Sequence, residues 1–535
     1  MAEFGTLNWS ILLVYIAANL YIGYLLGKKV DSADDFFLGD RSTPWWAIGI
    51  SVLGTYVSAL TFLGAPAWAY TDGLSVIAIH LNYPLVIAVV ITFFLPFFFN
   101  SGVASIYEYQ ERRFGATSRV VISAIFLLSQ ALTSAAVLYA TALVLEFITG
   151  VQVEFAIGIV TVIALIYTAM GGITAVIWTD VVQAAILLVG GGIIFYALLT
   201  QMPTPLGETL DALKAEGLTR ALDFSPDITK VTTIWSGVIA MTIFHITVYG
   251  ANQMMVQRTL AAKNIGDAKK SFLFMGFGAF FIYFLFIFLG ILFYSYYGGR
   301  EFENGNTIIL TFAADYGLPG LMGIIAAAVM AASMSSLDSA FNSMATVSTV
   351  DFYQRFFKPE ATSDDCLRVS RVFTVLWAAA IIVPAIIFSR SEGSILETLS
   401  KVGSYFVGAK LSMYALGFFS KHTTERGLLI GIVVGFATIW YVATQSDIAW
   451  PWYCAIGATV NMVVSWLSSL MLDGRQTEYS DYTVQGQLAA FRRDGGEAME
   501  GGWYRIPGKF DRINYVLIGF FVLCLVFLYA FDALI

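Results

Sequence analysis

The sequence predicts an all-α polytopic membrane protein with about 14 transmembrane helices. Of its 535 residues, 58% are hydrophobic and only 12% are charged, which is roughly half the charged fraction of an ordinary soluble domain. The apolar residues form runs of about 20, the length that an α-helix needs to cross a hydrocarbon layer about 30 Å thick. Basic residues gather in alternate connections between these runs, which is the bias that membrane insertion imposes.

The apolar runs are bounded by charges or by Gly and Pro clusters, and the whole chain, 1–535, is expected to form one transmembrane domain. A peripheral first helix precedes a core over about 46–419, and three C-terminal helices follow a further connection. The long loop 472–512 is expected to be cytoplasmic and irregular, with one amphipathic piece. The expected spans are 9–27, 46–70, 76–99, 118–148, 154–170, 180–200, 233–257, 270–297, 318–350, 368–389, 395–419, 427–443, 450–471 and 513–533.

The orientation follows from the distribution of Lys and Arg. With the N-terminus outside, 22 of the 29 basic residues, Arg258 and Lys269 among them, fall in inner connections and only 5 in outer ones. Lys401 and Lys410 fall within a span. Both termini are therefore predicted to be extracytoplasmic. The N-terminus lacks a basic region and a cleavage site, so the first apolar run is expected to be a span and not a signal peptide.

Motifs of soluble enzymes are missing from the sequence. It contains no GxxxxGK[ST], HExxH or GxSxG pattern, and Cys366, Cys454 and Cys524 are too scattered for a metal site or a disulfide framework. We expect neither an enzyme nor a nucleic-acid-binding protein.

The stretch SMSSLDSAFNS at 333–343 interrupts an apolar run with polar side chains. At helical spacing, Ser335, Asp338 and Asn342 share one strip, and Ser336 and Ser339 lie on the strip beside it. A carboxylate facing lipid would cost at least about 2.5–3.5 kcal/mol, so this strip must face protein, water or an ion. Two interpretations remain open. In the first, the serines mediate close helix packing and Asp338 pairs with Lys410. In the second, the oxygen atoms of these side chains bind a small alkali cation.

Five segments, in order along nearly the whole chain, resemble the sodium:solute symporter family. They are DDFFLGDRSTPWWAIGISVLGTYVSALTFLG (34–64), IYEYQERRFG (106–115), IYTAMGGITAVIWTDVVQ (166–183), YGANQMMVQRTLAAK (249–263) and SSLDSAFNSMATVSTVDFY (335–353).

The resemblance implies a leucine-transporter-like fold, two inverted repeats of five helices with a midplane site between broken helices. The first core helix, 46–70, would be interrupted near 54–58, and its repeat mate would be 180–200 onward. The implied activity is sodium-coupled secondary active symport by alternating access, which takes a small solute and Na⁺ across the cell membrane. The rival classes are a passive channel or a transporter-like sensor. The oligomeric state is left open.

The resemblance also implies one sodium position common to the family and a second one in members that use two sodium ions; which of the two cases holds here is left open. The common one would use the carbonyl oxygens of Gly54, Val57 and Ala332 and the hydroxyls of Ser335 and Ser336. A second would use Asp180, Asp338 and Ser339.

For the solute, the resemblance points to positions on four spans. A sugar or polyol is the first expectation, and a small carboxylate, with Lys410 as a counter-charge, is the alternative. Lys410, in mid-span, is expected either to pair with Asp338 or Asp180 or to occupy a cation site when sodium is absent. The implied solute contacts are Thr61, His80, Tyr83, His245, Tyr249 and Ser400.

Overall fold

The computed structural model describes residues 4–27, 42–101, 105–170, 173–391, 393–476, 478–495 and 497–534. Residues 34–41 of the first resembling segment, and the glycine pair 171–172 of the third, lie outside the described residues.

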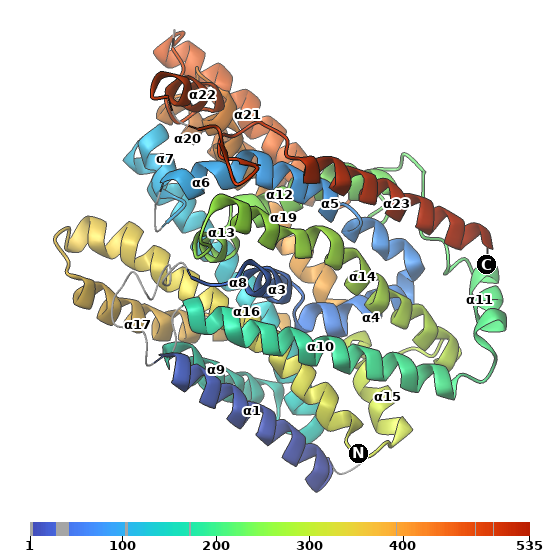
Figure 1. The fold of residues 1–535 in the computed structure, drawn as a ribbon. Helices are drawn as coiled ribbons and strands as arrows, with labels where there is room; N and C mark the ends of the chain where they lie inside the picture. Colours follow the sequence, from blue (N-terminus) through green and yellow to red (C-terminus); the bar gives the residue numbers. More distant parts are fainter. Residues whose placement is uncertain are drawn as a thin grey trace.

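Helices running side by side make up almost the entire described chain (Figure 1), and the strands are limited to one short hairpin. The N-terminal part comprises α1 (Gly5–Gly27), α3 (Trp45–Tyr56), η1 (Leu60–Gly64), α4 (Ala65–Asp72), η2 (Gly73–His80), α5 (Tyr83–Val89), η3 (Val90–Phe94), α6 (Leu95–Ser101), α7 (Glu108–Arg113), α8 (Ala116–Thr149), α9 (Val153–Met170), α10 (Ile173–Gln201) and α11 (Leu206–Ala215). The middle comprises η4 (Ser236–Ala240), α12 (Met241–Gly250), α13 (Gln253–Leu260), α14 (Ile265–Tyr297), η5 (Gly305–Thr307), α15 (Ile308–Tyr316), α16 (Leu321–Val347), η6 (Ser348–Phe357), α17 (Ser363–Ala380), α18 (Ile382–Phe388) and α19 (Ile395–Phe419). The C-terminal part comprises α20 (Glu425–Gln445), α21 (Pro451–Asp473), α22 (Val484–Arg493), β1 (Met499–Glu500), β2 (Trp503–Tyr504) and α23 (Arg512–Leu534).

Ten helical segments of the described chain are long and apolar enough to cross a membrane. The remaining predicted spans correspond to α9, to α19, to the interrupted helix made of η4, α12 and α13, and to α3 with the helix that continues it. The second and third predicted spans are joined by the 3₁₀ helix η2 instead of a loop.

The first core helix is interrupted where the sequence predicts a break. Helix α3 ends at Tyr56, and Val57 has φ −78° and ψ 86°, outside the helical region. The chain then resumes as η1 and α4. Such a break leaves backbone carbonyl groups without helical partners at the centre of the molecule.

The expected position of the second broken helix is wrong. Helix α10, which covers 180–200, runs without interruption from Ile173 to Gln201. Its Gly190 permits close packing, because a Cβ there would lie 2.9 Å from Ala328 Cβ. The second interruption falls instead at Ala251 and Asn252, between α12 and α13, where the Asn252 side chain caps α13 by accepting from Met254 N at 2.9 Å.

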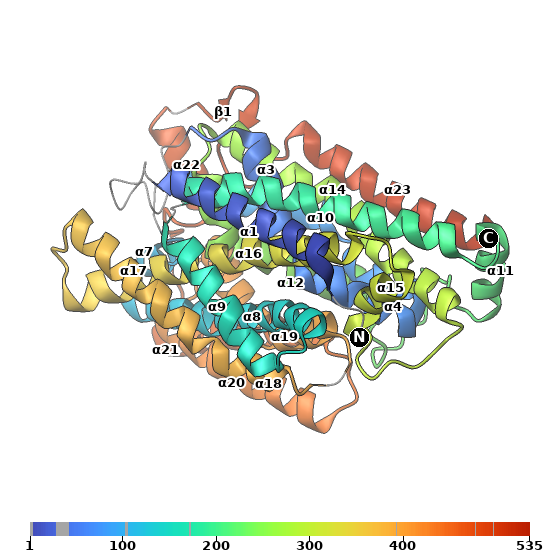
Figure 2. The ribbon, with the colours of Figure 1, turned by 90° about the horizontal axis from the view of Figure 1, so that it is seen from below.

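Both termini lie at the end of the bundle that carries α11, while α7 and α22 lie at the opposite end (Figures 1 and 2). Both termini lie at the same end when a chain crosses the bundle an even number of times, which agrees with the 14 predicted spans. Which of the two ends faces the cytoplasm stays a prediction.

The loop 472–512 contains the expected amphipathic piece as α22, followed by the β1–β2 hairpin. Its end is fastened to the core, because Lys269 at the start of α14 donates to Asp511 Oδ2 at 2.6 Å and to the Tyr504 carbonyl at 2.8 Å. The Lys269 side chain is fully buried, so it is held within the protein, while its predicted place on the inner side stays a prediction.

Candidate functional site

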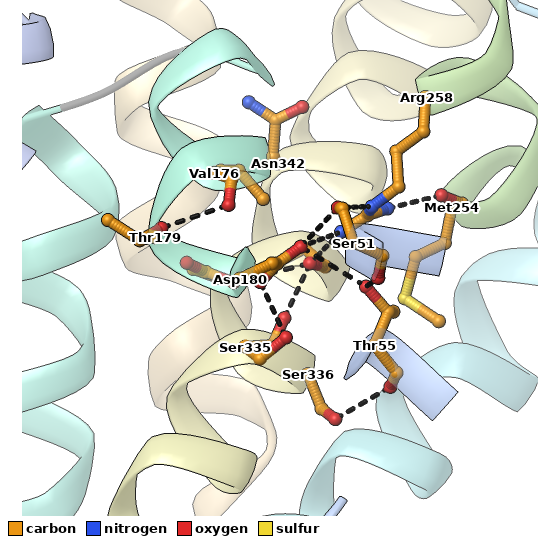
Figure 3. Close-up of polar contacts among 12 residues, drawn as sticks. Ser51, Thr55, Val176, Thr179, Asp180, Met254, Arg258, Ser335, Ser336 and Asn342 are labelled. Carbon is orange, nitrogen blue, oxygen red and sulfur yellow. Dashed lines mark hydrogen bonds and ion pairs between the residues drawn. The ribbon is translucent and has the colours of Figure 1, made fainter. Parts of the chain in front are cut away.

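The break in the first core helix meets the serine-bearing face of α16. Almost every residue of α16 is buried, and the Ser336 hydroxyl donates to the Thr55 carbonyl at 2.8 Å (Figure 3). The same hydroxyl lies 3.3 Å from the Ala332 carbonyl. Hard, neutral oxygen atoms from two segments far apart in the sequence therefore converge at this point.

Gly54, whose carbonyl group stays an expected sodium ligand, also has a packing role. It lies within α3, one turn before the interruption, and a Cβ there would lie 3.4 Å from Ala184 Cβ and 3.6 Å from the Asp180 carbonyl. Its small size thus permits close packing of α3 on α10, while the departure from helical geometry begins at Val57. Ser335 lies beside this contact, but its hydroxyl donates to Asp180 Oδ1 at 2.5 Å.

Arg258 occupies the centre of the second expected ion position (Figure 3). Its Nε donates to Ser51 Oγ at 2.8 Å, its Nη2 lies 3.4 Å from Asp180 Oδ2, and it also bonds the Ser339 hydroxyl and the Met254 carbonyl. Both side chains of the Arg258–Asp180 ion pair are fully buried. The guanidinium places a positive charge beside Asp180 and Ser339, where the family resemblance implies a second sodium ion.

This role of Arg258 was missed by sequence reasoning, which counted the residue only among the basic residues of an inner connection. In the structure it lies in the last turn of α13 and is fully buried in the core. The only sequence signal was its place in the QR pair of the YGANQMMVQRTLAAK segment.

The expected pairing of Lys410 with Asp338 or Asp180 is also wrong. Lys410 Nζ donates to Ser129 Oγ on α8 at 3.1 Å and forms no ion pair with any described residue. Asp180 has Arg258 as its counter-charge instead. Asp338 Oδ1 accepts from the backbone N–H of Ser339 at 2.6 Å and from its hydroxyl at 3.2 Å.

A cavity of about 100 Å³ lies next to the contact between α3 and α16. Thr55 and Ser336 line it, so the converging oxygen atoms form part of its wall. Of the six expected solute contacts, Ser400 lines the cavity and the other five do not. The polar lining residues are Thr55, Tyr56, Ser58, Ser129, Gln130, Thr133, Ser134, Asn252, Tyr283, Ser336, Ser400 and Lys410.

Three of the other expected contacts form a buried, hydrogen-bonded aromatic cluster. His80 Nδ1 lies 3.1 Å from the Tyr83 hydroxyl, which lies 3.5 Å from His245 Nε2. His245 Nδ1 donates to Asn82 Oδ1 at 2.8 Å. The His80 ring stacks on Tyr283, with 3.7 Å between ring centroids. These contacts satisfy most of the polar atoms of the two histidines within the protein.

The last two expected contacts belong to the same cluster. The Tyr249 ring lies 5.3 Å from that of Tyr56, and Thr61 donates to the Tyr283 hydroxyl at 3.3 Å. Because Tyr56 and Tyr283 line the cavity, the five residues form a second layer behind these two rings. Sequence reasoning found this second layer and missed the tyrosines in front of it.

Two broken helices packed against a polar helix, with a cavity at their junction, define a membrane carrier that binds an ion and a solute at its centre. The model of the sodium:solute symporter family matches residues 36–435, and the chain belongs to this family.

Similar proteins agree with this assignment. A sodium/sialic acid symporter of Aliivibrio fischeri is 30% identical over 88% of this chain and 94% of its own. The sodium-coupled monocarboxylate transporter 1 of Homo sapiens is 28% identical over 83% of this chain and 73% of its own. A solved structure of a substrate-bound, outward-open Na⁺-coupled sialic acid symporter superposes with a TM-score of 0.79 at 27% identity, covering 88% of this chain and 99% of that one.

The chain is thus a multi-pass membrane protein with a leucine-transporter-like fold and a sodium-coupled symporter, not an enzyme. The predicted fold class, family and use of Na⁺ are confirmed. Its transported partners are sodium and a small solute.

Proposed function

We propose that this symporter carries a small organic monocarboxylate together with sodium. The supporting observation is Lys410, which is the single charged side chain among the described residues that line the cavity. It is 6% exposed and has only the Ser129 hydroxyl as a side-chain partner there. A buried ammonium group without a counter-charge is unfavourable. A carboxylate solute supplies that counter-charge while it is bound, and the charge departs with the solute when the solute is released.

The size of the cavity favours a small solute. A cavity of about 150 Å³ is enough for one benzene molecule, and this one measures about 100 Å³. By that measure the space holds about four non-hydrogen atoms, so an acid of two or three carbon atoms needs little enlargement of the cavity, whereas a hexose or a sialic acid needs much more. The hydroxyl and amide groups of the lining suit a hydroxy or keto group beside the carboxylate. The sugar or polyol that the sequence suggested first is therefore the second candidate.

For sodium we propose the position between the interrupted helix and α16. The carbonyl groups of Val57 and Ala332, with the Ser336 hydroxyl, remain the expected ligands, and the Thr55 carbonyl joins them because Ser336 bonds it directly. The Gly54 carbonyl group also remains an expected ligand, whereas the Ser335 hydroxyl donates to Asp180 instead. Since Thr55 and Ser336 line the cavity as well, sodium that draws these groups together also shapes the solute site. Each ligand then raises the affinity for the other, with a coupling of about 1–3 kcal/mol.

The test is uptake into proteoliposomes with an inward sodium gradient. Lactate, pyruvate and acetate are compared with galactose and N-acetylneuraminate, and choline replaces sodium as the control. We expect sodium-dependent uptake of at least one monocarboxylate. Lys410→Met is expected to raise its KM at least about tenfold, or 1.4 kcal/mol, whereas Lys401→Met, at an exposed position on the same helix, leaves it unchanged. Uptake of galactose or N-acetylneuraminate without any monocarboxylate uptake refutes the proposed substrate.

A further inference from the structure

The peripheral helix α1 places a polar cluster against α10 and α16. The hydroxyl of Tyr15 accepts from Asn19 Nδ2 at 3.4 Å and from Gln183 Nε2 at 3.5 Å, and it donates to Met334 Sδ at 3.8 Å. Asn19 Nδ2 also lies 3.7 Å from this sulfur. The Tyr15 hydroxyl thus uses its donor and both acceptor positions, and it holds both amide groups with their nitrogen atoms toward it.

This arrangement leaves three buried oxygen atoms without a hydrogen-bond donor among the described residues. They are Asn19 Oδ1, Gln183 Oε1 and Asp338 Oδ2. The three residues are 2%, 0% and 1% exposed. Buried oxygen atoms are rarely left unpaired, because each costs about 1–3 kcal/mol and more when it is charged. Three such oxygen atoms in one region indicate that a positively charged ligand binds there.

The three oxygen atoms come from neighbouring turns of the three helices. Helix α1 runs parallel to α16, since Asn8 accepts from Gly323 N at 2.9 Å near one end and Asn19 contacts Met334 further along. Asp338 follows Met334 by one helical turn on the same face. Gln183 likewise follows Asp180 by one turn on α10, and both Asp180 and Asp338 act electrostatically on the Tyr15 hydroxyl.

The charges of this region do not balance. Asp180 and Asp338 bring two carboxylates, and Arg258 brings one guanidinium, all buried. Arg258 is engaged by Asp180, Ser51 and Ser339, while Asp338 forms no ion pair with a described residue. One positive charge is therefore missing at membrane depth, where an unpaired carboxylate is costly.

We propose that α1, α10 and α16 together bind a monovalent cation, taken as sodium, through Asp338 Oδ2, Asn19 Oδ1 and Gln183 Oε1. One carboxylate and two amide oxygen atoms are hard ligands and carry a single negative charge, which matches an alkali ion and not a divalent one. The position differs from the one that Arg258 fills and from the one beside Ser336. It makes the peripheral helix α1 a ligand-bearing part of the carrier.

The experiment is equilibrium binding of ²²Na⁺ to the purified full-length chain in choline buffer at neutral pH. We expect two sodium ions per chain. Asn19→Leu and Gln183→Leu are each expected to remove one of them or to weaken its binding at least about tenfold. Ser10→Ala is the matched control on α1, because this exposed hydroxyl bonds only the Thr6 carbonyl of its own helix, and it should bind two.

A second variant tests the site without removing a ligand. Tyr15→Phe keeps the ring but releases both amide groups. It is expected to weaken the binding of the same sodium ion about tenfold. Ser336→Ala should remove the other ion and leave the sensitivity to Asn19→Leu intact, which separates this site from the proposed site beside the cavity. A wild-type count of one sodium, with Asp338 neutralised by a proton, overturns the proposal. So does a count of two in both leucine variants.

Discussion

The buried ion pair between Arg258 and Asp180 provides a quantitative test of the structure. Replacing Arg258 with Met leaves the Asp180 carboxylate with hydroxyl donors, of which Ser51 and Ser335 are the closest, but without a full counter-charge. Breaking a fully buried pair by removing one partner costs about 3–5 kcal/mol, because the remaining charge is uncompensated. Asp180→Asn is expected to cost a similar amount, since it leaves the guanidinium buried alone.

The double variant distinguishes this ion pair from two independent packing effects. With both charges removed, the loss of stability should be about 2–3 kcal/mol smaller than the sum of the single losses. The free energy of unfolding is measured for the wild type and the three variants by SDS titration in mixed micelles, at fixed sodium concentration. Losses that add within about 0.5 kcal/mol would show that the two side chains do not interact, and the assignment of Arg258 as the counter-charge of Asp180 would fail.

Three further variants have expected outcomes. Ser336→Ala should raise the sodium concentration for half-maximal uptake at least about tenfold, measured as sodium titrations of uptake, and an unchanged value would exclude this hydroxyl as a ligand. Gly237→Ala should abolish folded, monodisperse protein in size-exclusion chromatography, since the new Cβ would lie 1.9 Å from the Ala78 carbonyl oxygen. Lys269→Met should lower the free energy of unfolding by about 3–5 kcal/mol by leaving Asp511 buried alone; restoration by Asp511→Asn in the same background is expected, and its absence counts against the pair.

The parts of the fold that could be predicted from the sequence are those fixed by neighbouring residues. The length of each apolar run determines whether it spans a membrane, and the spacing of Ser335, Ser336 and Asp338 determines which strip of α16 is polar. The interruption near Val57 was predicted by resemblance and is present. These features depend on local chemistry or on a matched motif.

The parts that could not be predicted depend on contacts between distant residues. Arg258 and Lys269 look like ordinary inner-loop charges until the chain folds back and brings Asp180 and Asp511 to them, 78 and 242 residues away. The same reason explains the wrong partner for Lys410, whose neighbour Ser129 is 281 residues away. Of the expected solute contacts, only Ser400 lies in the cavity wall, because placing a residue on a helix does not tell which of its side chains face the cavity and which lie in the layer behind it.

The ion pair between Lys269 and Asp511 can form only late in the synthesis of this protein, because its two residues are 242 positions apart. The ammonium group enters the assembly long before the ribosome has made the carboxylate that neutralises it. Until residue 511, which directly precedes α23, has left the ribosome, the nascent carrier holds an unmatched charge at the start of α14. Chains that stop short of residue 511 should therefore leave Lys269 without its carboxylate partner, even though every helix that forms the ion and solute sites has already been made.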